Sequence, residues 1–325
     1  MEKRSISAVV PVYNEAPILV AAHARISKCL SDLGQPYEII YINDGSTDDS
    51  LETLNTLASD DPDVAVINLS RNYGKEIALS AGLDQTAGQL VVVLDADLQD
   101  PPELISDMLD LMEAESVDVV YGVRRRRDGE SFIKKITAKL FYKIVNALGE
   151  IHLPENSGDF RLMTRRVVTA ICAQREKHRY MKGIASWVGF PSAALIYDRE
   201  PRIGGETGWG YWKLVNLAIE GITSTSMAPL RFISLLGIII SISAFVFGGL
   251  IMVETILYGN DVAGYPSLMV AVLFLGGIQL FSMGIIGEYL GRIFNETKNR
   301  KLYFTESVTL SALQRKDPFD GPKGS

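Results

Sequence analysis

The sequence predicts an α/β fold with a mostly parallel sheet, followed by two long apolar helices. In the N-terminal half, short runs rich in valine and isoleucine alternate with segments of helical spacing. Two long uncharged runs lie near the C-terminus. The 325 residues suffice for about two domains, at roughly 150 residues each. We therefore expect one α/β domain and a separate helical hairpin.

Five short segments have the length and the β-branched composition of strands that are buried on both faces. They comprise residues 6–12, 38–43, 64–69, 90–96 and 117–122. Helical spacing is found in between, at residues 16–33, 47–58 and 76–86, and the turn at residues 44–48 supplies an N-cap for the second of these helices. Sheets of this kind bind ligands beyond the carboxyl ends of their strands, where polar clusters follow three of the predicted strands.

The composition excludes several classes of protein. Lysine and arginine together number 32 and aspartate and glutamate 39, so the net charge of −7 argues against a nucleic-acid binder. Two cysteines and three histidines lack the number and the spacing of a disulfide framework or a zinc site. The mean hydropathy of +0.13 is high for a soluble domain, which indicates that apolar sequence is concentrated in part of the chain.

That apolar sequence lies in residues 232–253 and 262–287, which contain no charged side chain. Each run exceeds the about 20 residues that a helix needs to cross a bilayer. A single run is compatible with a buried soluble helix, but two runs joined by a short loop favour transmembrane helices at residues 232–257 and 266–287. Basic residues flank the pair, and none lies in the loop; they are Arg231, Arg292, Lys298, Arg300 and Lys301. The positive-inside rule then places both termini in the cytoplasm of a cell-membrane protein.

These segments divide the chain into three parts. Residues 1–228 form a cytoplasmic domain, residues 229–291 a membrane hairpin and residues 292–325 a cytoplasmic tail. Eight basic and two acidic side chains lie in residues 123–143, and apolar spacing predicts an amphipathic helix at about 131–148. A second helix, at about 211–226, opens with aromatic residues and leads to the membrane. We expect both helices at the membrane interface; a core-packed helix with a solvated basic face is the alternative for the first.

An acidic motif, Asp95-Ala96-Asp97, ends the most apolar of the predicted strands. Strand alternation points both carboxylates to the same side, where they repel each other unless a cation lies between them. Such oxygen ligands suit a hard divalent ion such as Mg²⁺, which commonly also binds phosphate oxygens. Dinucleotide-binding and P-loop functions lack their fingerprints, because neither glycine-rich motif is present.

Five motifs occur in order between residues 6 and 165. They read VPVYNE (10–15), INDGSTDDS (42–50), RNYGKEIALSAGLD (71–84), DADLQDPPE (95–103) and SGDFRLM (157–163). Together they resemble the inverting family-two glycosyltransferases of GT-A fold. With its C-terminal apolar pair, the chain is most similar to the polyprenyl-phosphate glycosyltransferases, a group that includes bactoprenol glucosyltransferases and dolichyl-phosphate mannose synthase. The resemblance implies a Rossmann-like domain with a mostly parallel sheet.

The resemblance also implies roles for individual residues. It assigns donor binding to Pro11, Tyr13, Glu15, Asp44, Lys75, Asp95 and Arg202, and catalysis to Asp95, Asp97 and Asp159. It further assigns a metal ion, Mg²⁺ or Mn²⁺, to Asp97 and Gln99. Ordinary loop surface is the alternative for Tyr13 and Lys75, and a turn or N-cap role is the alternative for Asp44.

The acceptor of this group, a lipid phosphate, is already anionic and can attack the anomeric carbon without a general base. It needs cations that position it and offset its repulsion from the donor diphosphate. The basic segment supplies such cations, and we predict that Arg124 and Lys135 bind the acceptor phosphate. Asp159 is then expected to orient the sugar or the acceptor. Arg202 begins a glycine-rich loop that departs from the group's pattern at Thr207, where serine is usual.

The predicted function is inverting, metal-dependent transfer of a hexose, with glucose from UDP-glucose as the first expectation, to undecaprenyl phosphate at the cytoplasmic membrane face. Aminoarabinose or mannose is the nearer alternative sugar, and a non-catalytic, membrane-anchored nucleotide-sugar-binding protein is the alternative from another class. A processive polysaccharide synthase is disfavoured, because the chain has no Gln-x-x-Arg-Trp motif. Gly287 and Gly291 permit close helix packing and a homo-oligomer.

Overall fold

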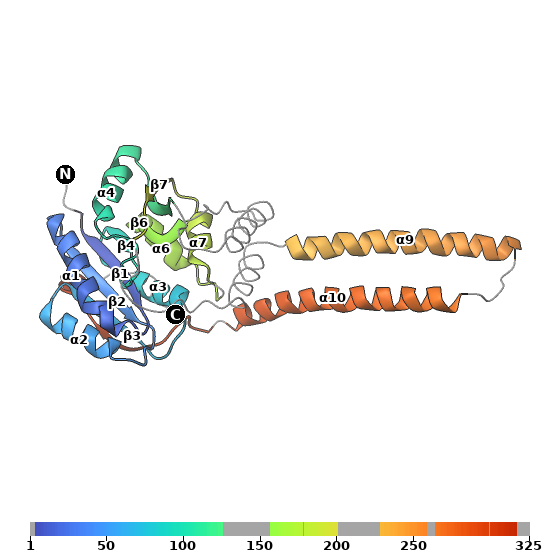
Figure 1. Ribbon diagram of the computed structural model, residues 1–325, viewed down its shortest axis with the longest axis horizontal. Coiled ribbons are helices and arrows are strands. Elements are labelled where there is room, and N and C mark those ends of the chain that lie inside the picture. Colours follow the sequence, from blue (N-terminus) through green and yellow to red (C-terminus); the bar gives the residue numbers. More distant parts are fainter. Residues whose placement is uncertain are drawn as a thin grey trace.

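The computed structural model describes residues 4–125, 157–177, 179–200, 228–258, 264–298 and 300–316. Its α/β domain is built on an eight-stranded sheet with the strand order β7-β5-β6-β4-β1-β2-β3-β8. The strands are β1 (Ile6–Val12), β2 (Tyr37–Asn43), β3 (Val64–Leu69), β4 (Leu90–Val93), β5 (Val119–Arg124), β6 (Ser157–Thr164), β7 (Ser192–Tyr197) and β8 (Thr305–Thr309). Figure 1 shows helices against this sheet and a long helical pair extending away from it.

The sheet is mostly parallel, as predicted. β1 runs parallel to β2 and β4, β2 to β3, and β5 to β7. β6 lies antiparallel between β4 and β5, and β8 lies antiparallel to β3 at one edge. The start of β6 therefore lies beside the end of β4, and this pairing brings residues from two distant motifs to one edge of the sheet.

Helices cover both faces of the sheet and bury its apolar side chains, which makes three layers. One apolar core joins the sheet to α1 (Ala16–Asp32), α2 (Ser50–Asp60) and α4 (Leu104–Glu115). A second core joins the opposite face to α3 (Lys75–Leu83), α6 (Arg165–Ala173) and α7 (Met181–Trp187). All residues of β1 except Pro11 are buried, as expected of a central strand in a parallel sheet.

Some predicted ends of strands and helices differ from those in the structure. The first and third predicted strands match β1 and β3, whereas β4 ends at Val93, before the acidic motif. Strand alternation therefore does not set the directions of Asp95 and Asp97. The second helix begins at Ser50 rather than at residue 47, because Asp48 ties two loops together. Its carboxylate accepts the Ser50 amide at 3.1 Å and the Ala16 amide at 3.2 Å.

The C-terminal tail returns to the α/β domain, a contact that no pattern in the sequence predicts. After β8 comes α11 (Ala312–Lys316), and this segment covers the side chain of Glu38, which is 0% exposed. Glu38 Oε1 accepts the Ser7 hydroxyl at 2.5 Å and the Ala87 amide at 2.7 Å, and Oε2 accepts the Ser311 hydroxyl at 2.6 Å. A buried carboxylate is costly without such donors, so the tail is part of the folded domain.

The two apolar runs form α9 (Ala228–Tyr258) and α10 (Tyr265–Thr297), which lie side by side (Figure 1). Among the residues that the structure describes, no helix is both long enough and apolar enough to span a membrane. The C-terminal end of α10 contacts the α/β domain, where Glu296 accepts the Lys177 amide at 2.6 Å.

Several predictions concern residues outside the described ranges. These are the two interface helices at about 131–148 and 211–226, together with the side chains of Lys135 and Arg202.

Candidate active site at the carboxyl edge of the sheet

Two carboxylates from distant motifs meet on one lysine at the carboxyl end of β4. Lys75 Nζ lies 2.6 Å from Asp95 Oδ1 and 2.7 Å from Asp159 Oδ2. Lys75 is the first residue of α3, Asp95 follows β4, and Asp159 belongs to β6. The structure thus brings together three residues that the sequence placed in three different motifs.

The antiparallel pairing of β4 with β6 explains why the carboxylates meet. Val93, the last residue of β4, is the partner of Arg161, so the loop that carries Asp95 starts beside the part of β6 that carries Asp159. Two carboxylates held close together repel each other. The ammonium group of Lys75 compensates this repulsion.

The electrostatics favour the charged forms of Lys75 and Asp159. Burial alone would lower the pKa of Lys75, but Asp95 and Asp159 outweigh it and raise that pKa above its ordinary value. Burial likewise favours a raised pKa for Asp159, yet Lys75 and Lys182 hold the pKa of this carboxyl well below its usual range. Lys182 Nζ lies 3.9 Å from Asp159 Oδ1.

Three charged residues next to this group were missed as functional candidates. Glu76 and Arg161 lie within two of the five motifs, but no role was predicted for them, and Lys182 lies outside all five motifs. Burial, reinforced by the charge of Asp159, raises the pKa of Glu76 to about 7. The Glu76 carboxylate accepts the Met181 amide at 2.8 Å and so ties α3 to the start of α7, which carries Lys182. The only sequence signal for the first two residues is their position beside Lys75 and Asp159. We call Lys75, Glu76, Asp95, Asp159, Arg161 and Lys182 the charged cluster.

The loop after β4 offers oxygen ligands that fit a hard divalent cation. The side chain of Asp97 is buried, and its Oδ1 accepts a hydrogen bond from the backbone amide of Gln99 at 3.1 Å. Within the described ranges, no three His, Cys, Asp or Glu side chains are grouped closely enough to hold a metal by themselves. A cation at Asp97 would therefore need further oxygens from a bound ligand, and Mg²⁺ commonly takes them from phosphates. The residues present fit a metal that is shared with a diphosphate.

Asp44 has a backbone role in the structure. Its carboxylate accepts the Tyr73 amide at 2.7 Å and the Gly74 amide at 2.9 Å, and burial raises its pKa. It thereby holds the loop that precedes α3, whose first residue is Lys75. This geometry agrees with the turn-like alternative that the sequence left open for Asp44.

The other residues assigned to the donor lie on or just after β1. Pro11 is within the strand, Tyr13 is 46% exposed, and Glu15 precedes α1. The Glu15 amide donates to the Ser50 hydroxyl at 3.0 Å, which fixes this loop against the start of α2. The exposed ring of Tyr13 and the charged cluster thus both lie at the carboxyl edge of the sheet.

Arg124, predicted to bind the acceptor, lies at the same edge. Its Nη2 is 3.3 Å from Asp100 Oδ2, and its Nε donates to the Tyr197 hydroxyl at 3.4 Å. The Tyr197 hydroxyl also donates to Asp100. A Cβ atom at Gly158 would lie 3.2 Å from Arg124 Nη2, so Arg124 passes close to the residue before Asp159. Arg124, the acidic loop and the charged cluster therefore share one edge.

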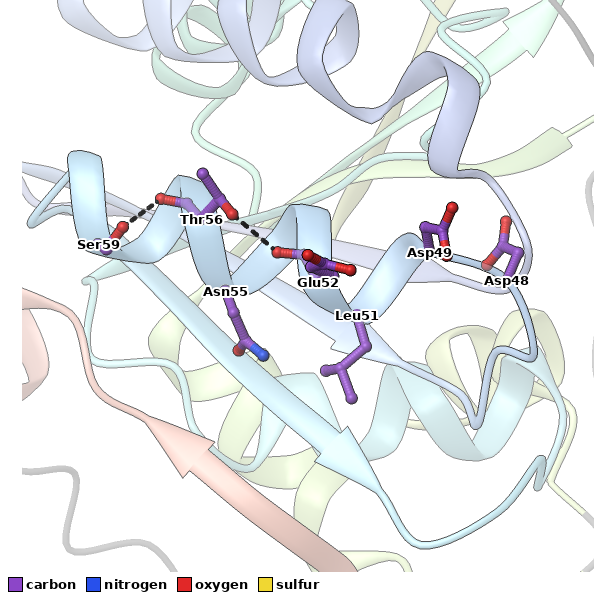
Figure 2. Close-up of a pocket in the computed structure, with 7 residues that line it drawn as sticks. All are labelled: Asp48, Asp49, Leu51, Glu52, Asn55, Thr56 and Ser59. Carbon is purple, nitrogen blue, oxygen red and sulfur yellow. Dashed lines mark hydrogen bonds between the residues drawn. The ribbon is translucent and has the colours of Figure 1, made fainter.

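An open hollow along α2 does not belong to this site (Figure 2). It is lined by Asp48, Asp49, Leu51, Glu52, Asn55, Thr56 and Ser59, none of which is in the charged cluster. Two of its hydroxyls donate to backbone carbonyls of the helix itself, Thr56 to Glu52 at 3.0 Å and Ser59 to Thr56 at 2.7 Å.

Comparison with known proteins identifies the family. The profile described as "Glycosyl transferase family 2" matches residues 7–172, which include β1 to β6 and the charged cluster apart from Lys182. The chain belongs to glycosyl transferase family 2. A second profile, described as "GtrB C-terminal hairpin", matches residues 228–293, the segment of α9 and α10. The family-two resemblance is thus confirmed, and the two predicted C-terminal helices match a hairpin profile.

Relatives match this family-two glycosyltransferase over nearly its whole length. It is 43% identical over 303 residues to a prophage bactoprenol glucosyl transferase homolog of Escherichia coli K12, covering 93% of this chain and 99% of that one. The bactoprenol glucosyl transferase of Shigella phage SfX is 43% identical over 304 residues, with 93% and 99% covered. A Synechocystis glycosyltransferase is 49% identical over 303 residues, with 93% and 95% covered.

The fold matches a solved family of structures as well. A mannosyltransferase from Pyrobaculum calidifontis, solved with GDP-mannose and Mn²⁺, superposes with a TM-score of 0.50. It is 16% identical and covers 87% of this chain and 84% of its own. At this identity the likeness concerns the fold alone, and it agrees with the predicted GT-A domain.

Proposed function

We propose that this glycosyltransferase moves a hexose, glucose from UDP-glucose, onto a polyprenyl phosphate with inversion at the anomeric carbon. The geometry supports sugar transfer from an anionic donor, because a cation-compatible acidic edge adjoins buried lysines and an arginine. The polyprenyl acceptor is supported by the 43% identity to relatives named bactoprenol glucosyl transferase, with 99% of each relative covered. This near full-length match, hairpin included, carries the proposal.

The donor diphosphate belongs at the loop after β4 in this proposal. Asp97, with Gln99, would hold a divalent cation, Mg²⁺ or Mn²⁺, which when bound neutralises charge on the departing nucleotide diphosphate. Tyr13, Pro11 and Glu15 line the neighbouring edge, where the nucleotide base and ribose would bind. Arg202 remains a candidate for the diphosphate and lies outside the described residues.

Asp159 is proposed to orient the sugar. Its Oδ1 is buried and accepts no hydrogen bond from any described residue, although Lys182 lies 3.9 Å away. Sugar hydroxyls are donors that would satisfy such an oxygen. Lys75 bridges Asp95 and Asp159 and so fixes the two carboxylates relative to each other. We therefore propose a catalytic set of Asp95, Asp97 and Asp159, with Lys75 as a donor-site cation.

The acceptor phosphate is proposed to bind at Arg124, with Lys135 as a second candidate outside the described ranges. An oxygen of the lipid phosphate attacks the anomeric carbon while the bond from that carbon to the diphosphate oxygen breaks. The phosphate needs no proton removed, so its chief requirement is positioning against the repulsion of the donor. Asp100 and Tyr197 orient the Arg124 guanidinium for this purpose.

The hairpin is proposed to span the cell membrane, with the catalytic domain and both termini on the cytoplasmic side. Large apolar side chains on both helices face outward, among them Phe232, Leu235, Phe247, Phe274 and Leu280, each more than half exposed. Exposed apolar surface of this extent requires an apolar cover. A lipid bilayer supplies one, and it also holds a polyprenyl acceptor. A homo-oligomer through Gly287 and Gly291 stays part of the proposal.

Transfer into lipid tests the proposed function. The full-length chain in membranes is supplied with undecaprenyl phosphate, Mn²⁺ and one radiolabelled donor at a time: UDP-glucose, an aminoarabinose donor or GDP-mannose. We expect label from UDP-glucose in the organic phase, and none when a chelator is added or the lipid is omitted. Label from another donor alone would correct the sugar, and absence of label from every donor would refute polyprenyl-phosphate transfer.

The acceptor role of Arg124 is tested separately. Arg124→Ala should raise the apparent KM for the lipid about tenfold or more, because charge-assisted hydrogen bonds to the phosphate are lost. The KM for the nucleotide sugar should change far less. Arg125→Ala is the matched control, since this exposed neighbour pairs with Asp198 at 3.2 Å. An equal loss in both variants would remove Arg124 from the acceptor site.

A further inference from the structure

Two buried asparagines connect the C-terminal tail with the loops at the carboxyl edge of the sheet. Asn43 ends β2 and Asn68 lies near the end of the neighbouring β3, and their side chains are 1% and 4% exposed. Asn43 Nδ2 donates to Asn68 Oδ1 at 2.8 Å. Buried amides of this kind are retained only where their donors and acceptors are satisfied.

On the donor side, the asparagine pair supports the loop after β1. The Ser46 backbone amide donates to Asn43 Oδ1 at 3.3 Å, and the Asn14 backbone amide donates to the Ser46 hydroxyl at 3.0 Å. Asn14 adopts a left-handed backbone conformation with φ of 55°, which few residues other than glycine adopt readily. Its side chain accepts the Thr47 amide at 2.8 Å. Asn14 lies between Tyr13 and Glu15, so the loop proposed to hold the nucleotide rests on these bonds.

On the tail side, the pair ends on a carboxylate. Asn68 Nδ2 donates to Glu306 Oε2 at 3.0 Å. In the β3–β8 register, Asn68 pairs with Ser307 and Leu69 with Thr305, so Glu306 is the extra residue of a β-bulge. Bulges redirect a side chain out of the regular alternation. Here the bulge allows a residue on an outer strand to reach an amide that is otherwise buried.

All the links of this chain donate in the same direction. The Asn14 backbone amide donates to the Ser46 hydroxyl, and the Ser46 backbone amide donates to the Asn43 side chain. The Asn43 side chain donates to that of Asn68, which donates to the Glu306 carboxylate. An ionised carboxylate only accepts hydrogen bonds, so it fixes which end of the Asn68 amide faces it. That orientation in turn fixes the Asn43 amide and leaves its oxygen for Ser46. The three bonds from the Ser46 backbone amide through the two asparagine side chains to Glu306 are continuous and strengthen one another, and the charged acceptor strengthens the last of them.

We propose that Glu306 and Asn68 are positioning residues for the nucleotide-binding loop of residues 11–15. The strand that follows the hairpin thereby sets donor affinity, although it does not contact the donor. This inference rests on the proposed function, in which that loop holds the base and ribose of a uridine nucleotide.

Binding of UDP to the full-length chain in detergent, with Mn²⁺ present, tests this inference by titration calorimetry. Glu306→Ala should raise the Kd for UDP about three- to tenfold, the range expected from the loss of one partly buried hydrogen bond. Glu306→Gln keeps an acceptor oxygen and should stay within about twofold of the wild type. In the transfer assay, the KM for the donor should rise while kcat changes little.

Two further variants separate positioning from general loosening of the tail. Tyr303→Phe removes a different tail contact, the hydrogen bond to Asp84 at 2.7 Å, and should leave UDP binding unchanged. Asn68→Leu should weaken binding, and adding Glu306→Ala to it should cause no further loss. An unchanged Kd in Glu306→Ala, equal weakening by Tyr303→Phe, or additive losses in the double variant would each overturn the inference. A wild-type chain that fails to bind UDP would instead refute the proposed donor, and the inference with it.

Discussion

At the scale of single residues, the site is organised by ion pairs between cationic side chains and carboxylates. Lys75 joins Asp95 and Asp159 at 2.6 and 2.7 Å, and Asp100 holds Arg124 at 3.3 Å. Each cation is thereby fixed at the edge where two anionic substrates would meet. Pre-set charges of this kind stabilise a transition state without reorganising during the reaction.

The acidic loop gives a direct prediction at this scale. Asp97→Ala should reduce sugar transfer on the order of 100-fold or more, because a carboxylate proposed to hold the cation is lost. Transfer is measured with radiolabelled UDP-glucose at saturating Mn²⁺. Asp107→Ala serves as a control, since this exposed aspartate lies in the first turn of α4 and is not among the proposed site residues. Activity of Asp97→Ala close to that of the wild type would contradict the metal role.

Glu76 gives a prediction about pH. Its pKa rises from an ordinary 4.5 to about 7 in the folded chain, so between these values the folded state keeps a proton that the unfolded state has lost. Stability therefore falls as the pH rises through this window, by up to about 3 kcal/mol, and the loss is complete above the folded-state pKa.

The variant Glu76→Gln cannot ionise and should lack this loss. The measurement is the urea midpoint of the full-length chain in detergent at pH 5 and pH 8. We expect the wild type to lose stability relative to the variant between these two values. Parallel pH curves for the two chains would show that Glu76 does not titrate there.

At the scale of elements, the site depends on the close approach of loops that follow neighbouring strands. Asp44 after β2 accepts the amides of Tyr73 and Gly74 and so fixes the start of α3. Gly45 allows this approach: a Cβ atom there would lie 2.4 Å from both the Arg71 carbonyl carbon and the Asn72 nitrogen. The two loops can come this close only because residue 45 has no side chain.

Gly45→Ala should therefore lower the free energy of unfolding by about 2 kcal/mol or more, through backbone strain and steric overlap. Gly34→Ala is a matched control. Both glycines have φ of +63°, but no heavy atom lies within 4 Å of a Cβ at Gly34. The difference between the two denaturant midpoints then measures the close approach alone. Equal losses would assign the whole effect to backbone conformation.

At the scale of the whole molecule, an α/β domain is joined to a long helical pair that extends away from it (Figure 1). The figure shows α3, α6 and α7 on the side of the domain that faces the pair, and α3 and α7 carry Lys75 and Lys182. β7, which precedes the pair in the chain, lies at one edge of the sheet, and β8, which follows the pair, lies at the other edge. The domain is thus connected to the hairpin at two separated places.

The proposed membrane span predicts that the full-length chain stays in the membrane pellet after an alkaline carbonate wash. Replacing Phe247 and Phe274 together by lysine should release it, because each lysine costs about 3 kcal/mol at the centre of a spanning helix. Both rings are more than half exposed. Lysines at the exposed positions Asn55 and Thr56 of α2 form the control. Release of the unaltered chain by carbonate would contradict the span.

The sequence by itself determined the local part of this protein. Short β-branched runs located β1 and β3, and two long uncharged runs located the helices of the pair, because burial on all sides leaves an unbroken apolar stretch in the chain. Five motifs identified the family and named Lys75, Asp95, Asp97 and Asp159. No local pattern could reveal that β6 enters the sheet beside β4, and it is that pairing which brings Asp159 to the loop that carries Asp95.

Only the tertiary structure decided which residues meet. Lys182 and Glu306 carry no motif, and they reach the site or its supporting asparagines through α7 and β8, elements whose pairing is set by packing over long separations in sequence. The end of β4 was also decided there, since the strand stops at Val93 and the acidic motif lies in the loop that follows it. An apolar run is a property of neighbouring residues in the sequence, whereas contacts between distant segments depend on the whole chain being folded.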